Sequence, residues 1–176
     1  HTRLRTVTGV QTCALPIFIP PKKGKSHILR IIRELINLEP VNKGTDLSQA
    51  LKYMTNVIKK KSIAFVISDF VSPKFETTLK IAARKHDIVA LNIYDERELI
   101  LPDVGLIRLI DEETGKEKWI DTSSKSIRQS FELRAKNQNK ELMDVFKRSG
   151  VDVVNLRTDQ NYVQPLINLF KKREKR

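Results

Sequence analysis

Two strongly apolar segments of the chain each end in an aspartate that could take part in chemistry. The run Ile63–Ile67 leads into Ser68 and Asp69, and the run Ile88–Tyr94 leads into Asp95. A carboxylate that ends a wholly apolar strand needs a partner or a function, because burying it alone costs free energy. Metal-dependent hydrolysis would need three or four convergent carboxylates, or a nucleophile with a base, and two aspartates are too few. Because Gly-x-Ser-x-Gly, His-x-x-x-His and Walker motifs are also absent, we expect no catalytic residues and no enzymatic activity, with Asp95 structural.

A short polar loop, Gly44-Thr45-Asp46, opens an amphipathic helix. Thr45 and Asp46 could simply be helix-capping residues, and we assign this role to Asp46 because Gln49 follows at the spacing of a capping box. In open α/β sheets, ligands bind at the carboxyl ends of the strands. This rule places the loop and Asp69 together at one functional edge.

The elements that would position these residues alternate between strands and helices from Phe18 onward. We expect parallel strands at 63–68, 88–94 and 151–156, because each has apolar residues on both faces, as strands of a buried parallel sheet do. A hairpin at 106–110 and 118–120 interrupts the alternation, and we expect Trp119 to pack from it onto the body. The pattern predicts an α/β, Rossmann-like domain: a parallel sheet with helices on both faces and one β-hairpin insertion.

The order and spacing of the motifs resemble the von Willebrand factor A-type domain, and within it the bacterial family called domain of unknown function 58. The resemblance rests first on Gly44-Thr45-Asp46-Leu47 and on the strand that ends in Ile67-Ser68-Asp69-Phe70. It extends over residues 18–176 and includes the segments Phe18–Gly24, Leu101–Gly105 and Asp121-Thr122.

The resemblance implies a metal-ion-dependent adhesion site (MIDAS) at the top of the sheet. Thr45 and Asp69 match the threonine and the aspartate that bind the metal, and Gly44, Asp46 and Ser68 form the supporting loop. Mg²⁺ prefers oxygen ligands in octahedral geometry, so a hydroxyl could bind it directly and a carboxylate through water. The implied function is a metal-ion-dependent protein–protein interaction module, an accessory of a MoxR-type AAA+ ATPase. Because the chain has no ATP site of its own, the ATPase would be a partner.

The beginning of the chain departs from this pattern. Residues 7–17 read VTGVQTCALPI, which resembles a translated sequencing adapter. We therefore expect residues 1–17 to be an artefactual leader outside the fold, and residues 18–176 to be a partial von Willebrand factor A-like domain with its N-terminal strands missing. The Asp-x-Ser-x-Ser motif of the adhesion site is absent. The complete protein is therefore expected to hold Mg²⁺, whereas binding by this fragment is weak or absent.

Charge and composition leave two alternatives open. The chain is 40% hydrophobic, contains no apolar run long enough to span a membrane and has a single cysteine, so we expect a cytoplasmic protein without a membrane partner. The net charge of +12 and the basic run at 171–176 would suit a nucleic-acid-binding α/β domain, but no aromatic residues interleave with that run to stack bases. A metal-dependent hydrolase on a similar sheet is the other alternative.

Overall fold

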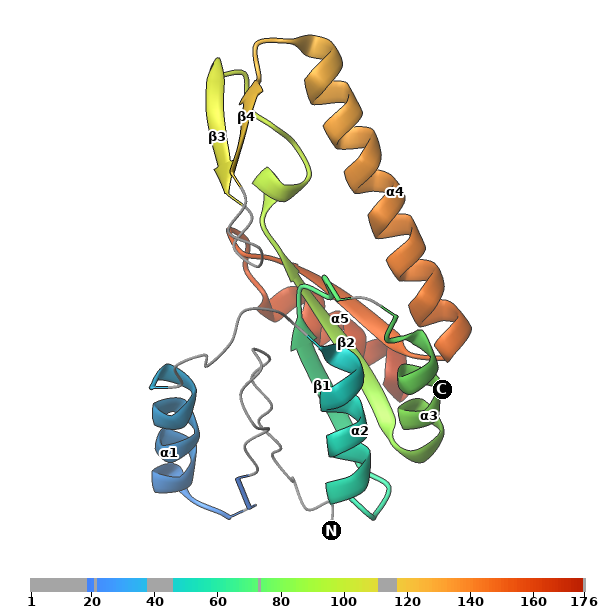
Figure 1. Cartoon of the computed structure of the whole chain (residues 1–176). Helices are drawn as coiled ribbons and strands as arrows, with labels where there is room; N and C mark the ends of the chain where they lie inside the picture. Colours follow the sequence, from blue (N-terminus) through green and yellow to red (C-terminus); the bar gives the residue numbers. More distant parts are fainter. Residues whose placement is uncertain (1–18, 21, 38–45, 73, 111–116, 176) are drawn as a thin grey trace.

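A computed structural model describes residues 19–20, 22–37, 46–72, 74–110 and 117–175 (Figure 1). The leader at 1–17 and the loop residues Gly44 and Thr45 lie outside this part of the chain. None of the helices described is both long enough and apolar enough to cross a membrane. The elements are, in chain order, α1 (Lys25–Ile36), α2 (Leu47–Val57), β1 (Ile63–Ser68), α3 (Glu76–Lys85), β2 (Asp87–Tyr94), the 3₁₀ turn η1 (Glu96–Glu98), β3 (Leu106–Ile110), β4 (Glu117–Asp121), α4 (Lys125–Ser149), β5 (Asp152–Arg157) and α5 (Val163–Glu174).

The main sheet has three parallel strands in the order β1-β2-β5. Phe65 lies opposite Val89, and Ala90 lies opposite Val153. The central strand β2 is almost wholly buried, which explains why most of its residues are apolar. Asn92 is the buried exception, and its amide donates to Asn155 Oδ1 of β5 at 3.0 Å. All three parallel strands predicted from the sequence are confirmed, within one residue of the expected bounds.

Helices cover both faces of this sheet, as the sequence predicts. On one face, α2, α3 and α4 pack around a large core, while α5 covers the opposite face (Figure 1). The α/β arrangement is therefore established. The first core is built from Leu47, Leu51, Met54, Ile58, Phe70, Phe75, Leu79, Ala82, Ile88, Ala90, Phe146 and Val151, and the second from Val89, Leu91, Val154 and Leu169.

The strand β1 is not buried on both faces, so the prediction made for it from its apolar sequence was wrong. Ile63, Phe65 and Ile67 are 50%, 41% and 63% exposed. They lie on the face of the sheet where α5 packs over β2 and β5. From α5, the ring of Phe170 contacts Phe65 edge-on, with 6.2 Å between ring centroids. Within the part of the chain that the structure describes, β1 pairs with β2 alone. An apolar stripe is therefore left on an edge strand.

The predicted hairpin is confirmed as the antiparallel pair β3–β4, which stands away from the main sheet beside the first half of α4 (Figure 1). Trp119 does not pack onto the body as expected, because its side chain is 62% exposed. It lies opposite Arg108, whereas Ile120 lies opposite Ile107 and is partly buried. Side chains alternate between the faces of a strand, so the half-burial of Ile120 leaves Trp119 on the outer face.

The basic C-terminal helix α5 is anchored to the sheet by Arg173. Its guanidinium donates to Asp152 Oδ2 at 2.9 Å and to both oxygens of Asp87, at 2.6 and 3.1 Å. These two aspartates begin β5 and β2, and their hydrogen bonds raise the pKa of Arg173 further. One cation of the C-terminal basic run is thus a structural clamp between two strands and a helix.

Substituting Arg173 with methionine is expected to lower the free energy of unfolding by about 2 kcal/mol, because two partly buried carboxylates lose a charged hydrogen-bond donor. Urea unfolding followed by circular dichroism measures the change. Lys172→Met removes the same charge from the neighbouring, exposed position and should change stability by less than about 0.5 kcal/mol. Equal effects of the two substitutions would contradict the clamp.

Candidate functional site

The carboxyl end of β1 carries Asp69 on a short loop that is ordered by its own polar groups. Ser68 Oγ accepts the backbone N–H of Phe70 at 3.0 Å. Asp69 Oδ1 accepts the N–H of Val71 at 3.2 Å and the Ser68 hydroxyl at 3.3 Å. Asp69 itself is exposed. Its carboxylate is therefore oriented by neighbouring residues and remains open to a ligand from solvent.

Phe70 anchors this loop to the hydrophobic core. Its backbone φ is +56°, a left-handed conformation that is uncommon for a bulky residue and persists only when surrounding structure holds it. The side chain is 5% exposed and packs edge-on against Phe146 and at a tilt against Phe75, with ring centroids 4.9 and 6.0 Å away. The packing of Phe70 against Phe75 and Phe146 thus determines the position of Asp69, the preceding residue.

The beginning of α2 meets the same loop. Leu47 N–H donates to Ser72 Oγ at 3.2 Å, and the Ser48 hydroxyl donates to the carbonyl of Lys74 at 3.2 Å. Asp46 accepts the N–H of Gln49 at 2.9 Å, so its predicted role as the cap of α2 is confirmed. The structure therefore brings Asp46 and the Ser68-Asp69 segment to one edge of the sheet. In the sequence, Thr45 directly precedes Asp46.

Asp95 ends the neighbouring strand β2 and has a structural role, as predicted. Its Oδ1 accepts the N–H of Arg97 at 2.8 Å and caps η1. Its Oδ2 accepts the hydroxyl of Thr158 at 3.2 Å, which joins the ends of β2 and β5. Both oxygens are therefore engaged in holding the sheet edge together.

Glu98 is a further acid at this edge that we did not predict. Desolvation raises the pKa of its carboxyl group, and the nearby carboxylates of Asp69 and Asp95 add to the rise. Burial and negative neighbours thus act together to oppose the ionisation of Glu98. The acid-rich stretch Asp95-Glu96-Arg97-Glu98 directly after a strand was the sequence signal that could have pointed to it.

The donors at this edge suit a hard divalent cation in kind but are few. Asp69 and Ser68 supply oxygen donors, which Mg²⁺ prefers over nitrogen or sulfur. Among the residues described, no three His, Cys, Asp or Glu side chains converge closely enough to hold a metal ion. A cation here would need further oxygens from the loop that contains Thr45, from water or from another protein.

The family to which the chain belongs follows from a comparison with protein-family models. Residues 6–141 match the model described as "Protein of unknown function DUF58". The chain belongs to the DUF58 family. This agrees with the family that the motifs at 44–47 and 67–70 indicate, and it establishes nothing finer than the family.

Curated relatives of this DUF58 protein come from mycobacteria and are described as uncharacterized proteins. One, from Mycobacterium avium, is 26% identical over 162 residues, which cover 89% of this chain and 94% of the relative. Others, from Mycobacterium bovis and Mycobacterium tuberculosis, are each 25% identical over the same share of this chain, but the chain spans only 50% of their length. No solved structure matches the chain significantly.

Proposed function

We propose that this DUF58 protein is a von Willebrand factor A-type, metal-ion-dependent protein-interaction module and not an enzyme. The observation that carries the proposal is the junction between the loop after β1 and the start of α2. The Leu47–Ser72 hydrogen bond fastens these segments together, and Asp69 stands exposed on the first of them. In the von Willebrand factor A-type domain that the chain resembles, these segments hold the threonine and the aspartate of the adhesion site.

Thr45 and Asp69 would hold Mg²⁺, with Gly44, Asp46 and Ser68 shaping the loop around them. Bound there, the cation would accept a carboxylate from a partner protein as a further ligand. Asp69 Oδ1 already accepts two hydrogen bonds, which orient the side chain before any ligand arrives. With few protein carboxylates at the site, affinity for the cation alone is expected to be weak, and partner and cation would bind cooperatively.

A MoxR-type AAA+ ATPase is the partner that we propose. A ligand surface made of a carboxylate, hydroxyls and a bound cation suits recognition of an acidic side chain on that ATPase. The alternative of a nucleic-acid-binding domain finds less support, because Arg173 of the basic C-terminal run is engaged with Asp87 and Asp152.

Binding of this chain to a purified MoxR-type ATPase, measured by biolayer interferometry, tests the proposal. We expect Asp69→Asn to weaken binding in Mg²⁺ at least about tenfold, and EDTA to weaken binding of the unaltered chain to the same extent, because both remove the bridge between the two proteins. Asp95→Asn is the matched control and should change affinity little. Because the ATPase itself uses Mg²⁺, the Asp69→Asn result decides. Binding that is indifferent to this substitution would contradict the proposal.

A further inference from the structure

A groove of about 220 Å³ lies between the β3–β4 hairpin and α4, on elements that take no part in the site at Asp69. Its apolar lining consists of Ile120 from β4 together with Ile127 and Phe131 from the first half of α4. Ile127 is 38% exposed, and the other two are partly buried. The hairpin and the helix thus form the two walls of an open groove with an apolar floor.

Hydroxyl groups and positively charged groups surround this apolar lining. Ser126, Ser130 and Arg134 follow one another at four-residue spacing and share a face of α4, and Lys118 faces them from β4. Among the residues that the structure describes, no acid lines the groove. Neither Lys118 nor Arg134 forms an ion pair with any other residue in the described part of the chain. Within the described part of the chain, the groove therefore combines an apolar floor, two hydroxyls and two positive charges that form no ion pair.

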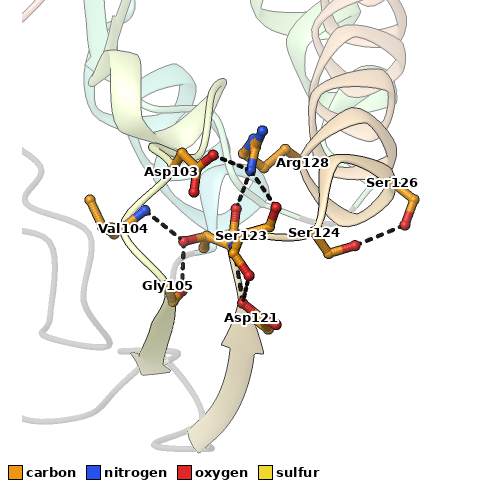
Figure 2. Close-up of polar contacts among 9 residues, drawn as sticks. Asp103, Val104, Gly105, Asp121, Ser123, Ser124, Ser126 and Arg128 are labelled. Carbon is orange, nitrogen blue, oxygen red and sulfur yellow. Dashed lines mark hydrogen bonds and ion pairs between the residues drawn. The ribbon is translucent and has the colours of Figure 1, made fainter.

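The two walls of the groove are fixed to each other at one end by Arg128 (Figure 2). Its guanidinium binds Asp103 Oδ2 at 2.9 Å and the carbonyl of Ser123 at 3.0 Å, and it also donates to the carbonyl of Thr122. The fully buried Thr122 in turn donates its hydroxyl to the carbonyl of Gly105 at 2.7 Å. The angle between hairpin and helix is thus held before a ligand binds, which lowers the ordering cost of binding.

We propose that this groove binds an acidic peptide segment of a partner protein that carries a large apolar side chain. The apolar side chain would pack on Ile127 and Phe131, and flanking carboxylates would pair with Lys118 and Arg134. The net charge of +12 would steer such a segment to the protein. A nucleic acid suits the groove less well, because Phe131 is the single aromatic ring among the described residues that line it and two isoleucines offer no surface for base stacking.

This second interaction surface does not depend on the proposed metal site. It lies on β4 and α4, whereas Asp69 follows β1, and it needs no cation. Peptide binding should therefore be unaffected by EDTA and by Asp69→Asn.

Selection of a phage-displayed library of random peptides on the immobilised full chain tests the proposal. Enriched peptides are expected to combine aspartate or glutamate with leucine, isoleucine or an aromatic residue. A fluorescein-labelled copy should bind Lys118→Glu/Arg134→Glu at least about tenfold more weakly than the unaltered chain. Ser130→Phe, which fills the groove without changing its charge, should weaken binding to a similar extent.

The control pair Lys140→Glu/Lys147→Glu makes the same change in net charge on the same helix, outside the groove. It should change peptide affinity by less than about threefold, because only long-range attraction is lost. Failure to enrich any peptide, enrichment without acidic residues, or equal weakening by the control pair would overturn the proposal. Displacement of the labelled peptide by a single-stranded oligonucleotide at a lower concentration than by the unlabelled peptide would assign the groove to nucleic acid.

Discussion

Phe146→Ala is expected to lower the free energy of unfolding by about 3–5 kcal/mol, because it empties a fully buried position at the centre of the larger core. Phe146 is 0% exposed and packs edge-on against Phe70, and such a pair adds about 1 kcal/mol to the burial of the ring. A loss of this size is a large fraction of the total stability of a domain. Denaturant unfolding followed by circular dichroism measures it.

The same substitution should also loosen the loop that carries Asp69, because Phe146 holds Phe70 in its left-handed conformation. Amide hydrogen exchange at residues 69–72 should then be faster than in the unaltered chain. Phe170→Ala is the matched control, since Phe170 is 49% exposed and its loss should cost less than about 1.5 kcal/mol. A cost below about 1 kcal/mol for Phe146→Ala would contradict its place in the core.

Self-association of the chain through β1 is the second large effect that we expect. Within the described residues β1 pairs on one side only, and Ile63, Phe65 and Ile67 form an exposed apolar stripe on it. An apolar edge strand without an internal charge or proline is a template for pairing with another chain. The positive net charge opposes association only weakly at physiological ionic strength, because salt screens it. Size-exclusion chromatography should show oligomers that increase with protein concentration.

Ile67→Lys should convert these oligomers largely to monomer, because a charge on an edge strand opposes pairing. Ile81→Lys provides the control, since Ile81 is similarly exposed, at 55%, but lies on the helix α3. It should leave the elution profile unchanged. A monodisperse unaltered chain would show that another segment covers the edge of β1.

The elements that the sequence predicts well are those whose pattern depends on local chemistry. The three parallel strands are rich in apolar residues, although Asn92 interrupts β2 and Asn155 interrupts β5. Asp46 caps α2 because its carboxylate reaches an N–H only three residues away. The exposure of β1 could not be predicted in this way, because an apolar strand looks the same in sequence whether or not a neighbour covers it. The prediction for Trp119 was wrong for a similar reason. The alternation of side chains determines which face of β4 the indole occupies, but not whether another element packs on that face.

For the candidate site, the sequence identifies residues but not their spatial relations. Asp69 stands out as an acid at the end of an apolar strand, and its assignment to a metal comes from the family resemblance. The contact between Leu47 and Ser72 joins residues 25 positions apart, and the approach of Glu98 to Asp69 depends on the path of the chain after β2. Such relations come from tertiary packing and leave no periodic signal in the sequence.

The most direct test of a cation site at the end of β1 is the broadening of amide NMR signals by Mn²⁺, which detects even weak sites. Signals of residues 46–48 and 68–72 should broaden first, and excess Mg²⁺ should restore them, because both ions prefer oxygen ligands. Asp69→Asn should abolish this broadening, and Asp95→Asn should preserve it. Broadening that centres on residues 95–98, or that persists in Asp69→Asn, would contradict a metal site built on Asp69.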